Sequence, residues 1–401
     1  MGHRLRPVLV PLVLSMLLTA CAADNGGEPG GADSDGAGSG DGPILIGVNV
    51  EQSGGASVQG QAYVNAVTLL VEQINADGGI LGRDVELEIV DNATDQTEAV
   101  TLTNQLVQQG VVAMIGPGTS PTTLAAMDVI LDSGIPTISM GSSDVISDPA
   151  SEHPNVFKTP QRGSLQAEEL VAHFEEVGIE SVGLIAVNNA YGDNGVESMQ
   201  ALADEGAIEL VGVERFEAED TSMVAQLNNL LGAGAEAILC WAIPPGAPTV
   251  RRNAVENLGI DVPMYFDAGA GAELFIELAG EAANDAFIVH PKTLIWDDVA
   301  TDDPQTEALQ AFGEAYTAEY GQMSGFAGYA WDALGLLRAA IEDSGDTTPE
   351  AIISGLEGLG EYVGVTGTFE ITAEDHQGLG EGDMVILQVE DGDWIPVSAG
   401  G

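Results

Sequence analysis

Residues 111–144, VVAMIGPGTSPTTLAAMDVILDSGIPTISMGSSD, decide the predicted fold. Residues 111–115 are apolar throughout, as a strand that is buried on both faces should be. After a glycine-rich turn, Ser120 is a favourable helix N-cap, and apolar residues then recur at helical spacing. Gly134 ends this helix, and residues 135–140 predict the next strand. The stretch therefore predicts one strand–helix–strand unit of a parallel sheet.

Two polar turns follow the two strands of this unit. The first contains Ser120 beside two glycines, and the second is Gly141-Ser142-Ser143. In a parallel α/β sheet, such turns lie at the carboxyl ends of the strands, where these folds bind ligands. Their hydroxyl and backbone N–H groups suit an anion such as a carboxylate. Ordinary helix capping explains the same residue types equally well, so both interpretations stay open at this point.

The same alternation of strands and helices runs through most of the chain. Ile44–Val50 and residues 85–90 predict strands ahead of this unit, and residues 182–187 begin a second series of strands. Because the second series has its own sheet, the predicted fold class is α/β with two doubly wound, Rossmann-like lobes. Further elements are predicted as long helices at 306–320 and 326–344, antiparallel strands at 366–371 and 384–389, and a hairpin-type turn at Asp391-Gly392.

The N-terminus carries a targeting signal. Residues 1–21 combine a basic start, an apolar run and the sequence Leu18-Thr19-Ala20-Cys21, which resembles a bacterial lipobox. Cleavage before Cys21 and lipidation of its thiol would anchor the chain to the outer surface of the cell membrane. A plain secretory signal is the alternative, since Ala20 could also precede cleavage. Residues 22–41, rich in glycine and aspartate, predict a flexible acidic tether.

The formal charge is −53, and it reaches about −55 once Arg4 and Arg6 leave with the signal. Nucleic acids and anionic membrane surfaces would be repelled by such a chain. We favour adaptation to high external salt, which screens self-repulsion, over an acidic secreted surface from a lineage sparing in lysine. The second cysteine, Cys240, lies in an apolar run, which predicts a buried inert thiol.

The sequence lacks the common motifs that would indicate a catalytic role. The chain contains no G-x-S-x-G, no H-E-x-x-H and no C-x-x-C sequence. GPGTSP lacks the third glycine of a dinucleotide-binding fingerprint, and the Gly-Asp clusters do not have calcium-loop spacing. We therefore expect no enzyme activity, no cofactor and no metal.

The chain resembles the leucine/isoleucine/valine-binding family of type I periplasmic binding proteins, from residue 44 to residue 397. The segments that carry the resemblance are IGVNVEQSGG, QINADGGILGR, VDNATDQTEAV, MIGPGTS, SGIPTISMGSS, NVFKTPQ, NNAYGDNG and GYAWDAL. The resemblance implies an extracytoplasmic, monomeric binding protein that delivers a branched-chain amino acid or a related carboxylate or amide to the permease subunits of an ABC importer. A ligand sensor of the same fold, feeding a signalling partner, is the alternative.

The family fold implies two lobes that are joined by three crossings and close on the ligand. Carried over to this sequence, the crossings fall near residues 159–162, 290–292 and 371–372. The first lobe would comprise residues 42–160 and 293–369. The second would comprise residues 161–291 and 372–398.

The resemblance also implies a ligand site. Ser120 and Ser143 match the family's carboxylate-binding hydroxyls, and Gly141 matches the nearby backbone group. Tyr191 matches the aromatic side chain that reaches in from the second lobe, and Phe326 matches an aromatic side chain near the hinge.

One departure affects the ligand. Amino-acid binders of this family carry an acid after the FKT segment to receive the ligand's ammonium, and here FKTPQRG places Arg162 and Gly163 there. The ammonium could instead meet Asp267 at the end of a strand, or the ligand could lack one. Arg162 could be an anion receptor or a hinge salt bridge.

Overall fold

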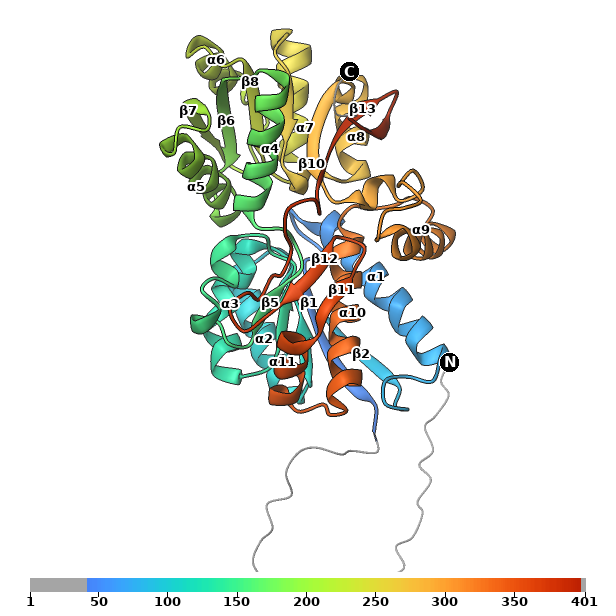
Figure 1. The fold of residues 1–401 in the computed structure, drawn as a ribbon. Coiled ribbons are helices and arrows are strands. Elements are labelled where there is room, and N and C mark those ends of the chain that lie inside the picture. The colour runs from blue at the N-terminus through green and yellow to red at the C-terminus, as the bar shows by residue number, and fades with distance from the viewer. Residues whose placement is uncertain (1–41, 398–401) are drawn as a thin grey trace, which may run out of the picture. The chain divides into compact units, whose positions relative to one another are not determined.

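A computed structural model describes residues 42–397, and the predicted signal peptide, lipobox Cys21 and tether lie outside this range. The fold is α/β with two lobes, each built on its own sheet, which confirms the predicted fold class (Figure 1). No helix among the described residues is both long enough and apolar enough to cross a membrane.

The first sheet has the strand order β2-β1-β3-β4-β5, and all its pairs are parallel. Alternate residues of β1 face opposite layers, as strand geometry requires. Ile44, Ile46 and Val48 pack on the α1 side, and Leu45 packs on the side of α2 and α3. The elements are β1 Ile44–Val50, α1 Ser57–Ala76, β2 Val85–Asp91, α2 Gln96–Gln109, β3 Ala113–Ile115, α3 Ser120–Ser133, β4 Thr137–Ser139, η1 Asp144–Ile146, η2 Ala150–Glu152 and β5 Val156–Lys158.

The second sheet has the order β14-β13-β10-β9-β8-β6-β7, in which β6 to β10 are parallel and β13 and β14 are antiparallel. Cys240 is buried in β8 as a free thiol. The elements are α4 Gly163–Val177, β6 Ser181–Val187, α5 Ala190–Asp204, β7 Glu209–Phe216, α6 Val224–Gly232, β8 Ala237–Trp241, α7 Gly246–Arg252, η3 Asn253–Leu258, β9 Met264–Phe266, η4 Ala268–Ala270, α8 Glu273–Ala279, η5 Gly280–Ala283, β10 Ala286–His290, η6 Lys292–Ile295, β13 Val385–Glu390 and β14 Asp393–Pro396.

After β10 the chain returns to the first lobe. There α10 packs beside α1, and both helices share the core that covers one face of the first sheet (Figure 1). Both predicted C-terminal strands are antiparallel, but they pair with different partners: β12 with β11, and β13 with β10 and β14. Asp391-Gly392 forms the expected turn between β13 and β14. The remaining elements are α9 Thr306–Tyr320, α10 Ala327–Ser344, α11 Pro349–Gly358, β11 Gly360–Val363 and β12 Thr368–Ile371.

The segment after β12 contacts strands of the first sheet and β12 itself. The carbonyl of His376 accepts a hydrogen bond from the N–H of Lys158 (3.2 Å), and the carbonyl of Gly378 accepts one from the N–H of Glu370 (2.8 Å). Residues 376–378 therefore lie against β5 and β12. The position of the third crossing stays a prediction.

The acidic surface leads to a prediction about salt. With 63 acidic and 10 basic residues, most acids cannot be paired with a cation, and their mutual repulsion weakens the compact state. Raising NaCl shortens the Debye length from about 10 Å at 0.1 M to about 3 Å at 1 M. We expect the melting temperature, followed by circular dichroism, to rise across that range. A melting temperature that does not change would contradict salt adaptation.

Candidate functional site

A cavity of about 430 Å³ is lined by residues of both lobes. The first lobe contributes the loops that follow β1, β2, β3 and β4, and the second contributes those that follow β6, β7, β8 and β9. Pro160 of the first crossing and two aromatic residues at the start of α10 complete the lining. The cavity therefore lies at the carboxyl ends of the parallel strands, where α/β folds bind ligands, and its volume suits a small molecule.

Ser120 lies in the lining at the first turn of α3. Thr119, and not Ser120 as the sequence suggested, is the N-cap: its hydroxyl accepts a hydrogen bond from the N–H of Thr122. Ser120 is thereby free of the capping role. Its hydroxyl oxygen accepts a hydrogen bond from the N–H of Ser143 (3.1 Å), which leaves the hydroxyl proton available to a ligand.

The loop after β4 brings Gly141 and Ser142 to the cavity. The hydroxyl of Ser142 is buried and has no hydrogen-bond partner among the described residues. Ser143, which the family resemblance favoured, is not part of the lining. Its backbone N–H donates the hydrogen bond to the Ser120 hydroxyl. A Cβ on Gly141 would come within 2.9 Å of the Ser120 nitrogen and 2.7 Å of the Ile146 side chain. Glycine therefore permits the close approach of the β4 loop to α3.

The other walls of the cavity are mostly apolar or aromatic. Phe326 lies edge-on to Tyr63, with ring centroids 6.4 Å apart. Tyr191 from the second lobe also lines the cavity, and the ligand-covering role that the family resemblance implies for it stays a prediction. Among the described lining residues, Glu219 alone carries a charge, and it is exposed. A ligand here would meet apolar surface together with neutral hydroxyl and amide groups.

Asp267 lies behind Tyr191 and is fully buried. Its carboxylate accepts hydrogen bonds from the Tyr191 hydroxyl and from the N–H groups of Ala242 and Gly269 (2.8 Å each). Burial raises the pKa of this carboxyl to about 7, although these hydrogen bonds favour the charged form. Asp267 does not line the cavity, and its carboxylate holds the hydroxyl of Tyr191, which does.

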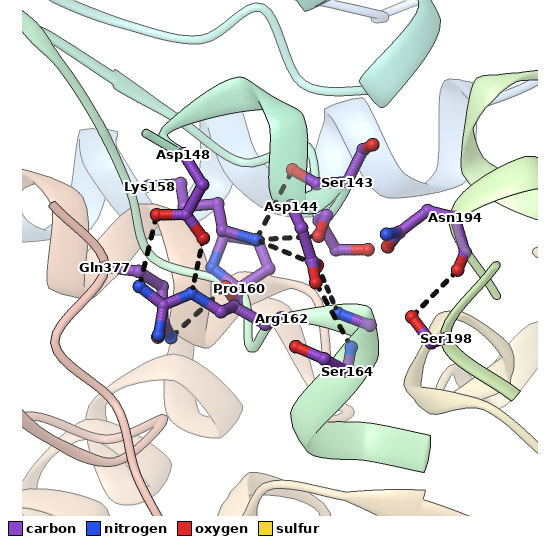
Figure 2. Close-up of polar contacts among 12 residues, drawn as sticks. Ser143, Asp144, Asp148, Lys158, Pro160, Arg162, Ser164, Asn194, Ser198 and Gln377 are labelled. Atoms are coloured by element: carbon purple, nitrogen blue, oxygen red, sulfur yellow. Dashed lines mark hydrogen bonds and ion pairs between the residues drawn. The ribbon is translucent and has the colours of Figure 1, made fainter. Parts of the chain in front are cut away.

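Arg162 also stays out of the lining. Its guanidinium pairs with Asp148 (3.0 Å; Figure 2). It also pairs with Asp375 (2.5 Å), and thus contacts the segment after β12. These contacts are those of a salt bridge, one of the two interpretations that the sequence left open.

Polar lining residues that the sequence did not single out include Gln59 and Gln166, and Ser142 was named only as part of its turn. The Gln59 amide donates to the Tyr63 hydroxyl (2.6 Å) and to the carbonyl of Gly118 (3.2 Å), while its oxygen is buried without a partner. The oxygen of Gln166 accepts from the N–H of Ala268 (3.0 Å). Both glutamines lie in the first turns of helices that approach the cavity, a position that could have suggested them.

Comparisons with known proteins agree with this geometry. The profile of the family described as periplasmic binding protein matches residues 43–393. A leucine-, isoleucine-, valine-, threonine- and alanine-binding protein from Pseudomonas aeruginosa is 24% identical over 292 residues, which cover 72% of this chain and 75% of that protein. A leucine-specific-binding protein from Salmonella typhimurium is 24% identical over 79% of this chain and 84% of its own length.

Solved structures share the fold. An extracellular ligand-binding receptor from Rhodopseudomonas palustris superposes with a TM-score of 0.82 at 24% identity, over 89% of this chain and 100% of that chain. The branched-chain amino acid transporter substrate binding protein LivJ from Streptococcus pneumoniae, solved with isoleucine, gives 0.77 at 28% identity, over 88% and 97%. These relatives are binding proteins and not enzymes.

Proposed function

We propose, from the premise that the chain belongs to the periplasmic binding protein family, that it captures a small carboxylate- or amide-bearing ligand outside the cytoplasm for an ABC importer. The observation that carries the proposal is the cavity lined by both lobes, with unpartnered polar groups on one side and aromatic side chains on the others. Ligand binding would favour a closed arrangement of the lobes about the three crossings. In this proposal the lobes divide near Pro160, Pro291 and residues 379–384.

The lining favours a ligand with a compact apolar body and a carboxylate or amide head. Ser120 and Ser142 offer hydroxyls, and Ser120 begins the 14-residue helix α3, whose dipole favours negative charge. Branched-chain amino acids have this chemistry, and both curated relatives bind leucine by name. Because Asp267 is engaged elsewhere, an ammonium would have to meet the neutral oxygen of Gln59 or the carboxylate of the exposed Glu219.

A thermal-shift screen tests this proposal. A ligand that binds only the folded state raises the melting temperature, by an amount that grows with its concentration over Kd. The panel should contain branched-chain and other amino acids, their amides, urea, short aliphatic acids and aromatic acids. We expect small carboxylates or amides with apolar bodies to raise the melting temperature most. No shift with any member would contradict the proposed ligand class.

Transport needs its own test, because a sensor of the same fold would bind the same ligand. Uptake of the labelled ligand into membrane vesicles that contain the permease and ATPase subunits of the proposed importer should require the binding protein. Uptake that is independent of it, together with ligand binding, would favour the sensory alternative.

Anchoring depends on Cys21, which lies outside the described residues. Replacing Cys21 by Ser removes the thiol that a lipid would modify, so we expect Cys21→Ser to move the protein from the membrane fraction to the medium. Cys240→Ala is the matched control, because Cys240 is buried within β8, and it should stay in the membrane fraction. Fractionation followed by immunoblotting measures both variants. A Cys21→Ser protein that stays on the membrane would rule out the lipid anchor.

A further inference from the structure

A single buried ammonium lies behind the polar side of the cavity. Lys158, the last residue of β5, is fully buried. Its Nζ donates to the carbonyl of Ser142 (2.7 Å) and more weakly to that of Ser143 (3.5 Å), and it lies 4.0 Å from Oδ1 of Asp144 (Figure 2). A buried lysine is costly because its charge loses hydration, so its position calls for an explanation.

The contacts of Lys158 fix one peptide group of the cavity. A trans peptide points its C=O and its N–H in opposite directions. The carbonyl of Ser142 is drawn toward Lys158, and the N–H of the same peptide, which belongs to Ser143, is thus directed to the hydroxyl oxygen of Ser120 (3.1 Å). With its oxygen engaged as an acceptor, the Ser120 hydroxyl has its proton free for the cavity.

Asp144 does not cancel this charge by direct contact. Its carboxylate accepts hydrogen bonds from the N–H groups of Gly163 (2.6 Å) and Ser164 (3.3 Å), at the start of α4 (Figure 2). The other charged groups around Lys158 are Arg162, Asp148 and Asp375: the Arg162 guanidinium pairs with both carboxylates, so this group carries one net negative charge and has no cation left for the loop. Lys158 is therefore the cation in direct hydrogen-bond contact with the loop that lines the cavity.

We propose that Lys158 is a positioning residue for an anionic ligand: it orients the Ser142–Ser143 peptide, and its charge selects a carboxylate over the neutral amide. The ammonium would not touch the ligand. It would act through the Ser142 carbonyl, the Ser143 N–H and the Ser120 hydroxyl. This inference rests on the proposed function, since it assigns a ligand charge to the same cavity. It accounts for anion binding at a cavity whose described lining has no cationic side chain.

Paired ligands test the selectivity. We would titrate wild type, Lys158→Met and Lys158→Gln calorimetrically with L-leucine, L-isoleucine, L-valine and their three amides. Losing one charge a few ångströms behind the site should weaken carboxylate binding about tenfold or more and amide binding much less. Lys292→Met is the matched control: Lys292 is the only other lysine, and it pairs with Asp303 (2.6 Å) outside the cavity lining. This control should keep the wild-type ratio.

The outcomes separate the two proposals. Wild-type protein that binds none of the three carboxylates would overturn the proposed branched-chain ligand, and the carboxylate selectivity with it. Wild-type binding of carboxylates, with an unchanged carboxylate-to-amide ratio in both Lys158 variants, would overturn the role of Lys158 alone. If Lys158→Met does not fold, Lys158→Gln decides, because it keeps a donor and loses only the charge.

A second measurement needs no variant. Because the chain has two lysines, protein labelled with ¹⁵N-lysine gives two Nζ signals, and Lys292 serves as the internal reference. Burial lowers the pKa of Lys158 to about 8, against the opposing effect of Asp144. A saturating carboxylate should raise the Lys158 midpoint and leave that of Lys292 unchanged, and by linkage its affinity should fall as pH rises above about 8. A Lys158 midpoint that a bound carboxylate does not move would overturn the inference.

Discussion

Ser120→Ala and Ser142→Ala are expected to lower the affinity for a carboxylate ligand about ten- to hundredfold each. A hydrogen bond to a charged group contributes roughly 1.5–3 kcal/mol, and each 1.4 kcal/mol is a factor of ten in Kd. Ser120 has its proton free because its oxygen accepts from Ser143, and Ser142 has a buried hydroxyl without a partner. Both hydroxyls are therefore prepared for a ligand and are not consumed by the fold.

Calorimetric titration with the strongest carboxylate from the thermal-shift screen measures these losses. Ser133→Ala is the matched control, because Ser133 ends the same helix and donates to the carbonyl of Ile130, away from the cavity. Ser143→Ala separates the two interpretations of the β4 loop: the family resemblance predicts its larger loss, and the cavity geometry predicts the larger loss for Ser142→Ala. Wild-type affinity in both Ser120→Ala and Ser142→Ala would place the ligand elsewhere.

The sequence predicted the fold because the signals were local and repeated. Helix α9 spans Thr306–Tyr320, the range that apolar spacing predicted. Not every strand has the predicted length: residues 135–140 shorten to β4 Thr137–Ser139, and Pro136, just before this strand, has no N–H to donate to the sheet. The contact of residues 376–378 with β5 and β12 could not be predicted, because it depends on hydrogen bonds from the N–H groups of Lys158 and Glu370 to carbonyls of that segment.

The site was only partly predictable for a similar reason. Four of the predicted residues line the cavity: Ser120, Gly141, Tyr191 and Phe326. They could be predicted because they lie at the ends of strands or the starts of helices. The choice between Ser142 and Ser143 depends on the orientation of the peptide between them, whose carbonyl accepts a hydrogen bond from Lys158, 16 residues away. The side chains of two other candidate residues are engaged by partners distant in sequence: Asp267 by Tyr191, 76 residues away, and Arg162 by Asp375, 213 residues away.

Asp267→Ala is expected to cost about 3 kcal/mol or more of unfolding free energy. Asp267 joins the ends of β8 and β9 to Tyr191, and its removal leaves the buried N–H groups of Ala242 and Gly269 without acceptors. Each buried donor left unsatisfied costs roughly 1–3 kcal/mol, and breaking a buried network is among the causes of large destabilisation. Tyr191→Phe is the matched variant. It removes one donor, keeps both backbone hydrogen bonds, and should cost only about 1 kcal/mol.

Urea denaturation of the purified variants measures these costs, and its pH dependence tests the assigned cause. Burial raises the pKa of Asp267 from 3.8 to about 7, so the folded state holds this proton more tightly than the unfolded state does. The resulting stabilisation is complete below pH 3.8 and is lost as pH rises through about 7. Asp267→Asn cannot ionise, so its stability relative to wild type should increase across that interval. If this difference does not change with pH, or if Asp267→Ala is as stable as wild type, Asp267 is not the buried anchor of Tyr191.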